Sequence, residues 1–130
     1  MSSRSLACLA SLPLLGACAY RNPAAEPVRV VFFNEDSDML EAAGRAVAQA
    51  AAKAARRFSS MRVNVFGYAV PVGGTGFIRA LSETRARHVA ELLRQAGVPG
   101  ERIFILGRGE VPFDMAPMES RRVEIRLATP

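Results

Sequence analysis

Cysteine is almost missing from this chain, and its two copies, Cys8 and Cys18, both lie near the N-terminus. A disulfide framework is therefore excluded in the remaining part of the chain, where the folding patterns are found. The chain also has only one histidine, His88. A zinc site built from cysteine and histidine ligands is excluded as well, so packing alone must hold the domain together.

The N-terminal region lacks an apolar run long enough to span a membrane: the run over residues 6–15 is shorter than the roughly twenty residues that a membrane-spanning helix needs. A charged start at Arg4, a short apolar run and a small-residue exit are typical of a secretory signal. Because Gly16 and Ala17 precede Cys18, the exit is similar to a bacterial lipobox, in which the thiol is acylated and the cysteine becomes the new N-terminus. An ordinary signal peptide that contains a cysteine is the alternative.

These features divide the chain into a signal peptide over residues 1–17, a lipidated Cys18 with its tether over residues 18–27, and a folded domain over residues 28–130. The tether has a reach of roughly 30 Å, at about 3.3–3.6 Å per residue. Since Ala19 rather than Asp follows Cys18, the resemblance to sorted lipoproteins implies an anchor in the outer membrane, on its periplasmic face.

Acidic residues are fewer than basic ones, 12 against 17, and the formal net charge is +5. A basic exported protein can meet anionic lipid, lipopolysaccharide or the carboxylates of the cell wall, and the charge does not choose among them. Nucleic acid is not an expected partner, because the basic residues are scattered along an exported chain.

Hydrophobic periodicity predicts four strands and two helices. The strands are expected over residues 28–33, 62–68, 103–106 and 122–127, and the helices over residues 39–58 and 82–96. The first helix has Ser37 or Asp38 as its expected N-cap, with Glu41 in capping-box register to Asp38, and the second has Ser82.

The order β-α-β-α-β-β predicts an α+β fold, an α/β sandwich in which two helices cover a mixed four-stranded sheet. Helical crossovers favour parallel pairing of the first strands, and the last pair can be antiparallel. In the last strand Val123 and Ile125 are expected to point inward, and Arg122 and Glu124 outward.

Four segments, in order along this framework, resemble the motifs of one known family. They are residues 33–40 (FNEDSDML), 81–86 (LSETRA), 109–112 (GEVP) and 121–125 (RRVEI). They are similar to the F-D-x-D-S-x-x-L, L-S-x-x-R-A, G-E-x-P and R-R-V-E-I motifs of the OmpA-like (OmpA/MotB/Pal) domain. The resemblance covers about residues 28–127 and implies an envelope module that binds peptidoglycan.

The family grips the diaminopimelate of the stem peptide, with an Asp on the ligand ammonium and an Arg on its carboxylate. The resemblance implies that Arg85 is this Arg and that Gly73 is the loop glycine. The Asp position is occupied by Val70 and an assisting Asn position by Ile78, so both are degenerate.

Two carboxylates, Asp36 and Asp114, are candidates to replace the missing Asp, and Arg121 is a candidate for the rim of the pocket. With Ser82 as the N-cap, Arg85 falls in the first helical turn, where free N–H groups favour an anion site. The alternative is that Arg85 pairs with Asp36 or Glu83, or lies on a solvated face.

Two functions remain open. The first is a lipid-anchored module that ties the outer membrane to peptidoglycan, weakly because truncating one partner of a buried charge pair costs about 2–5 kcal/mol. The second is an interaction module for another envelope protein, favoured by the apolar Val70 and Ile78. The residues indicate no cofactor, no catalytic triad and no paired-carboxylate site, and the glycine-rich segment at residues 73–76 lacks the Gly-Lys-Ser/Thr of a phosphate-binding loop. An enzyme is not expected.

Overall fold

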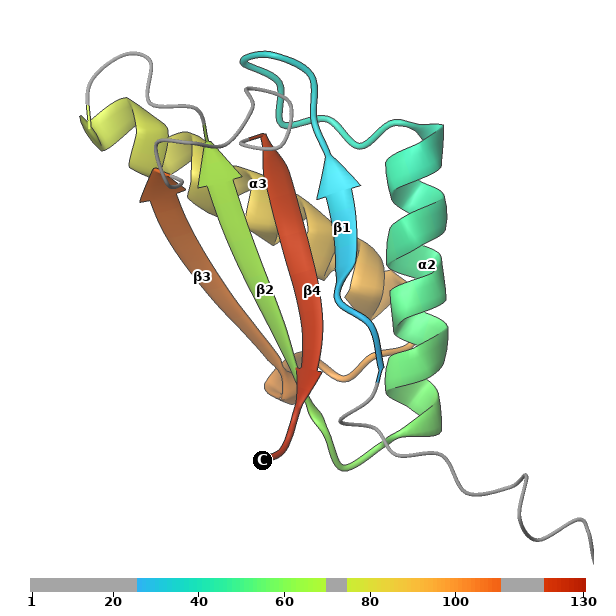
Figure 1. The fold of residues 1–130 in the computed structure, drawn as a ribbon. Helices are drawn as coiled ribbons and strands as arrows, with labels where there is room; N and C mark the ends of the chain where they lie inside the picture. The colour runs from blue at the N-terminus through green and yellow to red at the C-terminus, as the bar shows by residue number, and fades with distance from the viewer. Residues whose placement is uncertain (1–25, 70–74, 111–120) are drawn as a thin grey trace, which may run out of the picture.

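The structure, a computed structural model, describes residues 26–69, 75–110 and 121–130. Its elements follow in the order β1 (Arg29–Phe32), α2 (Ala42–Arg57), β2 (Arg62–Ala69), α3 (Thr75–Gln95), the short 3-10 helix η2 (Gly100–Arg102), β3 (Ile103–Glu110) and β4 (Arg122–Ala128) (Figure 1). The expected signal peptide and most of the tether, with Cys18, lie outside the described residues. No helix of the described part combines the length and apolarity that a membrane span requires.

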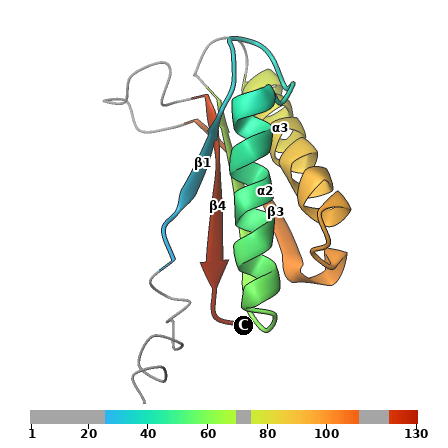
Figure 2. The same cartoon turned by 90° about the vertical axis from the view of Figure 1, so that its right-hand side faces the viewer.

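The core lies between the sheet and its two helices, which cover the same face of the sheet (Figure 2). Helix α2 contributes small side chains, among them Ala48, Ala52 and Ala55, which let the helix lie close to the strands. Val123 and Ile125 of β4 are 0% and 2% exposed. The predicted inward orientation of these two residues is therefore confirmed.

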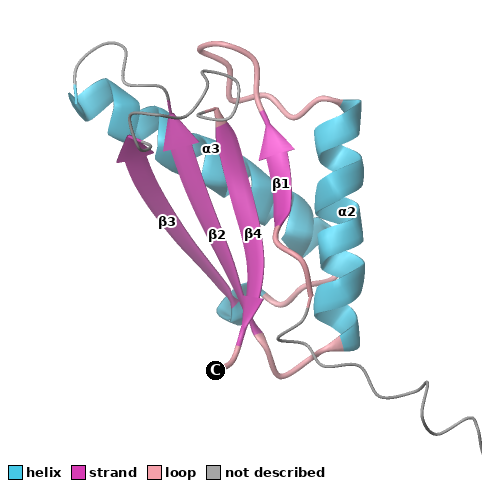
Figure 3. Cartoon of the chain, viewed as in Figure 1, coloured by secondary structure: helices cyan, strands magenta, loops and turns pink. Residues whose placement is uncertain are grey.

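The predicted α+β class with a mixed four-stranded sheet is confirmed, and the strand order is β1-β4-β2-β3 (Figure 3). β2 and β3 pair in parallel, as the helical crossover predicts, whereas β4 is antiparallel to both of its neighbours, β1 and β2. Two pairing expectations are wrong: β1 does not pair with β2, and β3 does not pair with β4. The reason is that β4 occupies the position between β1 and β2.

Helix α3 rests directly on β2 and β3 because two glycines face it. A Cβ atom on Gly67 would overlap the backbone carbonyl of Ser82, and one on Gly107 would overlap the side chain of Glu83. Only glycine allows this close approach of helix and sheet. The contact fixes the height of Ser82 above the sheet, and with it the position of Arg85, which follows one turn later.

The predicted starts of both helices are wrong. Helix α3 begins at Thr75, well before Ser82, and the Ser82 hydroxyl donates to the carbonyl of Arg79 at 2.9 Å inside the helix. A serine inside a helix can donate in this way to a carbonyl three or four residues earlier, instead of capping a helix N-terminus. Helix α2 begins at Ala42, with Glu41 as an N-cap that makes no side-chain capping bond. Glu41 instead accepts a hydrogen bond from Asn34 at 2.6 Å.

On the other face of the sheet, arginine side chains lie over aromatic rings. The guanidinium of Arg122 lies 4.2 Å from the centre of the Tyr68 ring, and that of Arg62 lies 3.8 Å from the centre of Phe104. Glu124 pairs with Arg122 at 3.1 Å. Arg122 and Glu124 are each 8% exposed, so these outward-facing residues are buried by stacking and ion pairing rather than by a second layer.

Candidate functional site

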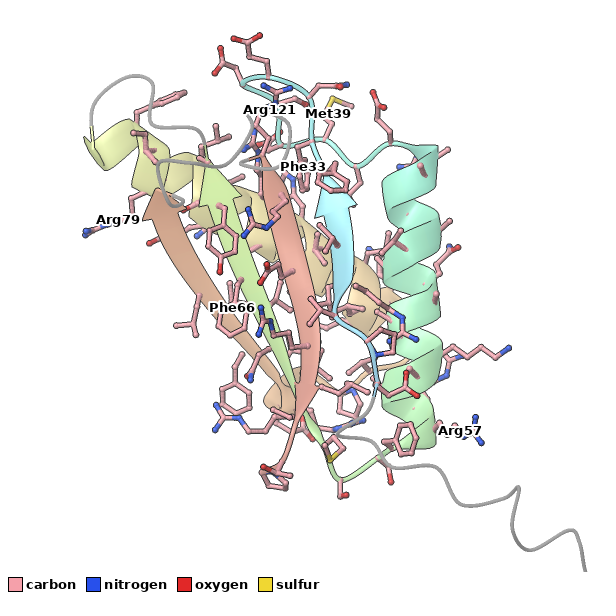
Figure 4. All side chains as sticks on the ribbon, in the orientation of Figure 1. Phe33, Met39, Arg57, Phe66, Arg79 and Arg121 are labelled. Carbon is pink, nitrogen blue, oxygen red and sulfur yellow. The ribbon has the colours of Figure 1, made fainter. Side chains whose placement is uncertain are left out.

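The candidate site lies at the end of the sheet where β1 and β2 finish and β4 begins (Figure 1). Phe33 and Arg121 join these segments there. The backbone N–H of Phe33 donates to the carbonyl of Arg121 at 2.8 Å, and Nε of Arg121 donates to the carbonyl of Phe33 at 3.3 Å. Figure 4 shows the two residues together at this end of the molecule. We call it the site end: residues 33–41, Arg85 and Arg121.

The loop that follows β1 is a tight turn held against α3. The N–H of Ser37 donates to the carbonyl of Asn34 at 3.1 Å, and Asp36 has a positive φ of 53°. Asp adopts this left-handed conformation more readily than most residues. Nδ1 of His88 donates to the carbonyl of Asp38 at 2.7 Å, so this exposed histidine anchors the loop to α3.

Arg85 of α3 binds the loop through hydrogen bonds to its backbone. Its side chain is 0% exposed, and it donates to three backbone carbonyls: Nε to Ser37 at 2.8 Å, Nη1 to Tyr68 at 3.2 Å and Nη2 to Asn34 at 3.1 Å. The guanidinium also lies 5.2 Å from the centre of the Phe33 ring. Arg85 therefore joins α3 to the end of β2 and to the loop after β1, an arrangement that we call the Arg85 clamp.

The alternatives for Arg85 can now be compared with the structure. Its complete burial contradicts a solvated face, and no carboxylate in the described part of the chain, Asp36 and Glu83 included, makes an ion pair with it. The reasoning from a helix N-terminus is also wrong, because α3 begins at Thr75 and Arg85 lies well inside it.

Burial and nearby charges together set the proton affinity of Arg85. Burial, and after it the positive charge of Arg121, lower the pKa of Arg85, while Asp36 and Asp38 raise it; the net result is a pKa of about 10. A pKa of about 10 leaves the guanidinium protonated at neutral pH. Two cations and two carboxylates thus influence one another at the site end.

The remaining predicted site residues are placed as follows. Asp36 is exposed and Arg121 is half-buried at the site end. Ile78 is 3% exposed in the first turns of α3, so its side chain is packed rather than presented to solvent. Val70, Gly73 and Asp114 lie outside the described residues.

Sequence reasoning missed Asp38 and the three carbonyls of the clamp. Asp38 lies two residues after Asp36 in the same loop motif. This spacing was the signal from which a second carboxylate at the site end could have been predicted. Backbone carbonyls leave no trace in a sequence. The described residues contain no group of three or more His, Cys, Asp or Glu side chains placed to hold a metal ion.

The chain belongs to the OmpA family, whose family model matches residues 32–124. This assignment agrees with the motifs around the site end and with the two-helix, four-stranded architecture.

Solved structures show the same fold. The peptidoglycan-associated lipoprotein from Burkholderia pseudomallei is similar with a TM-score of 0.71 and 21% identity, over 76% of this chain and 89% of that one. The OmpA-like domain of FopA1 from Francisella tularensis has a TM-score of 0.68 and 22% identity, over 79% and 75%. The cell wall anchor of the T6SS from Pseudomonas aeruginosa has a TM-score of 0.64 and 22% identity, over 79% and 81%. No curated protein sequence matches the chain significantly.

Proposed function

We propose that this protein is an outer-membrane lipoprotein whose OmpA-like domain contacts peptidoglycan without a covalent bond and so ties the membrane to the cell wall. The observation that carries the proposal is the gathering of Arg85, Arg121, Asp36 and Asp38 at one end of the fold. Membership of the OmpA family supports it, as does the likeness to a peptidoglycan-associated lipoprotein and to a cell wall anchor.

The charges at the site end suit a zwitterion such as the diaminopimelate of a stem peptide. Its carboxylate is matched by the guanidinium of Arg121, which is the less buried of the two arginines, and its ammonium by the exposed Asp36. Arg85 acts beneath them: it holds the loop that carries Asp36, and its charge adds to the attraction for a carboxylate. This chemistry is binding alone, with no reacting group.

The contact is weak because the family's usual anion is absent. Val70 stands where the family has the Asp that pairs with the ligand ammonium, and a valine side chain accepts no hydrogen bond. Truncating one partner of such a pair costs about 2–5 kcal/mol, or roughly thirtyfold in affinity at the lower bound. Asp36, which is exposed, restores part of this attraction.

A second function, docking to another envelope protein, is favoured by apolar side chains near the same end. Met39, at the same end of the molecule as Arg121 in Figure 4, is 71% exposed, and Phe77 near the start of α3 is 53% exposed. Exposed apolar groups of this kind are typical of protein contacts. Under this reading the Arg85 clamp is purely structural.

Sedimentation with purified diaminopimelate-type sacculi separates the two functions. We expect residues 19–130 to sediment weakly, and Arg121→Gln and Asp36→Asn each to reduce the bound fraction by up to about fivefold, since an exposed ion pair contributes about 0.2–1 kcal/mol. Arg57→Gln, at the other end of the molecule, is the matched control and should bind as the wild type does. If the wild type stays in the supernatant, wall binding is rejected and the docking function takes its place.

The lipid anchor is tested separately, by mass spectrometry of the protein extracted from membranes. We expect a chain that begins at Cys18 and carries a diacylglyceryl or triacyl modification, and we expect Cys18→Ser to abolish it. Residues 1–17 still attached, or an unmodified Cys18 in the soluble fraction, would contradict the anchor.

A further inference from the structure

A second charged surface lies at the opposite end of the molecule from the site end. It is a pocket of about 420 Å³ between the start of β1 and the C-terminal half of α2. Its lining residues, which we call the basic pocket, are Glu26, Pro27, Arg29, Ala50, Lys53, Ala54 and Arg57. Figure 4 shows Arg57 at one end of the molecule and Arg121 and Met39 at the other.

The charge of this pocket is positive. Glu26 pairs with Arg29 at 3.1 Å, which neutralises the carboxylate that lines it. Lys53 and Arg57 are exposed and lie one turn apart on the same face of α2. Within the described part of the chain neither makes an ion pair with a carboxylate. Two cations therefore remain available to a ligand beside the apolar floor of Ala50 and Ala54.

In sequence, this pocket includes the first described residues after the expected membrane anchor at Cys18. Glu26 and Pro27 line it, and only seven residues of sequence separate Glu26 from Cys18. The tether is short, with a reach of roughly 30 Å, so the end of the domain that carries the pocket is the end held close to an anchored lipid. Phosphate groups of anionic lipids attract Lys and Arg at such a surface.

We propose that the basic pocket binds the phosphate headgroups of anionic phospholipids and so seats the domain on the membrane, with the site end turned away toward the cell wall. The orientation rests on the proposed function, because it needs the lipid anchor. The headgroup binding does not, because it depends only on the two available cations of the basic pocket, Lys53 and Arg57. One fold thus presents a lipid-facing end and a wall-facing end.

The test is co-sedimentation of residues 19–130 with vesicles of phosphatidylcholine alone or mixed with phosphatidylglycerol. This fragment contains every described helix and strand and the whole described core. We expect binding to the anionic vesicles only. Lys53→Gln together with Arg57→Gln should lower the partition coefficient by about 25-fold, about fivefold for each charge, from about 1 kcal/mol per cation at about 1.4 kcal/mol per decade.

The matched control is Arg79→Gln together with Arg87→Gln, which removes the same charge from exposed positions of α3. It should keep wild-type binding, while high salt should weaken all binding. Failure of the wild type to bind anionic vesicles, or an equal loss in the control, would overturn the proposal. The pocket variant should still sediment with sacculi as the wild type does. Vesicle binding without sacculus binding would reject the proposed function and the orientation, and would leave the headgroup binding standing. Sacculus binding without vesicle binding would reject the headgroup binding and leave the proposed function standing.

Discussion

Two arginines at opposite ends of the molecule, Arg85 and Arg102, each donate hydrogen bonds to three backbone carbonyls. Arg102 donates from Nε to Met61 at 2.8 Å and from Nη2 to Ala55 at 2.9 Å and Phe58 at 2.8 Å, all backbone carbonyls. Two of these carbonyls belong to the last turn of α2 and its C-cap, where cations are favoured by the helix dipole and by carbonyls without helical partners. Arg102 completes a helix end.

Arg85 differs because its carbonyls come from two separate segments, the loop after β1 and the end of β2, and because other charges surround it. Burial and the Arg121 charge lower the pKa of Arg85 to about 10, with Asp36 and Asp38 opposing them. The comparison teaches that burial of an arginine on carbonyls does not by itself mark a binding site. The mixture of charges around the Arg85 clamp is what distinguishes the site end from the Arg102 end.

The largest expected effect comes from the core that both ends share. Ile125 is 2% exposed between the sheet and the helices, and Ile125→Ala should lower the free energy of unfolding by about 2–5 kcal/mol. Urea unfolding followed by circular dichroism measures the loss. The loss for Ile125→Ala is the reference against which the losses for the two arginines are compared. A loss below about half a kcal/mol would place β4 outside the core.

Replacing each arginine by alanine sharpens the comparison. Arg85→Ala should cost about 3 kcal/mol, because a completely buried side chain and its charged hydrogen bonds to three carbonyls are lost together. Arg102→Ala should cost about half as much, since Arg102 is partly exposed and water can replace its donors. The same unfolding measurement decides, and equal losses would show that the two environments do not differ.

Much of the fold was predictable because periodicity reports which face of an element is buried. Val123 and Ile125 alternate with charged residues, and this fixed the inward face of β4 correctly. The place of β4 between β1 and β2 was not predictable, because alternation says nothing about neighbours. The start of α3 was missed because the Ser82 hydroxyl can cap a helix or bond back within one, and residue type does not distinguish these uses.

The site was predictable to a smaller extent. The motifs placed Arg85, Arg121 and Asp36 together, and the structure brings them to one end of the fold. The burial of Arg85 was not predictable, because it depends on the carbonyls of Asn34, Ser37 and Tyr68, which any residue would supply. Ile78 was expected at a degenerate ligand position, and its burial means that Ile78→Asn would place an amide in a packed site and lower stability.

The smallest expected effect is a gain in affinity for peptidoglycan. Val70→Asp restores the anion that the family uses for the ligand ammonium, and it leaves Arg85, Arg102 and the buried Ile78 unsubstituted. Val70→Asn has nearly the same shape without the charge and is the matched control. Comparing the two variants shows whether the missing charge, rather than polarity or size, limits the affinity for the cell wall.

The measurement that tests the central claim most directly is therefore the affinity of these two variants and the wild type for diaminopimelate-type sacculi, at low and at high salt. A weak wild-type affinity, a gain of about tenfold in Val70→Asp, about 1.4 kcal/mol, and no gain in Val70→Asn are the predicted result. The gain should shrink at high salt, because an exposed charge pair is screened. Tight binding by the wild type, or no binding by Val70→Asp, would contradict the claim that this domain contacts the cell wall through a weakened zwitterion site.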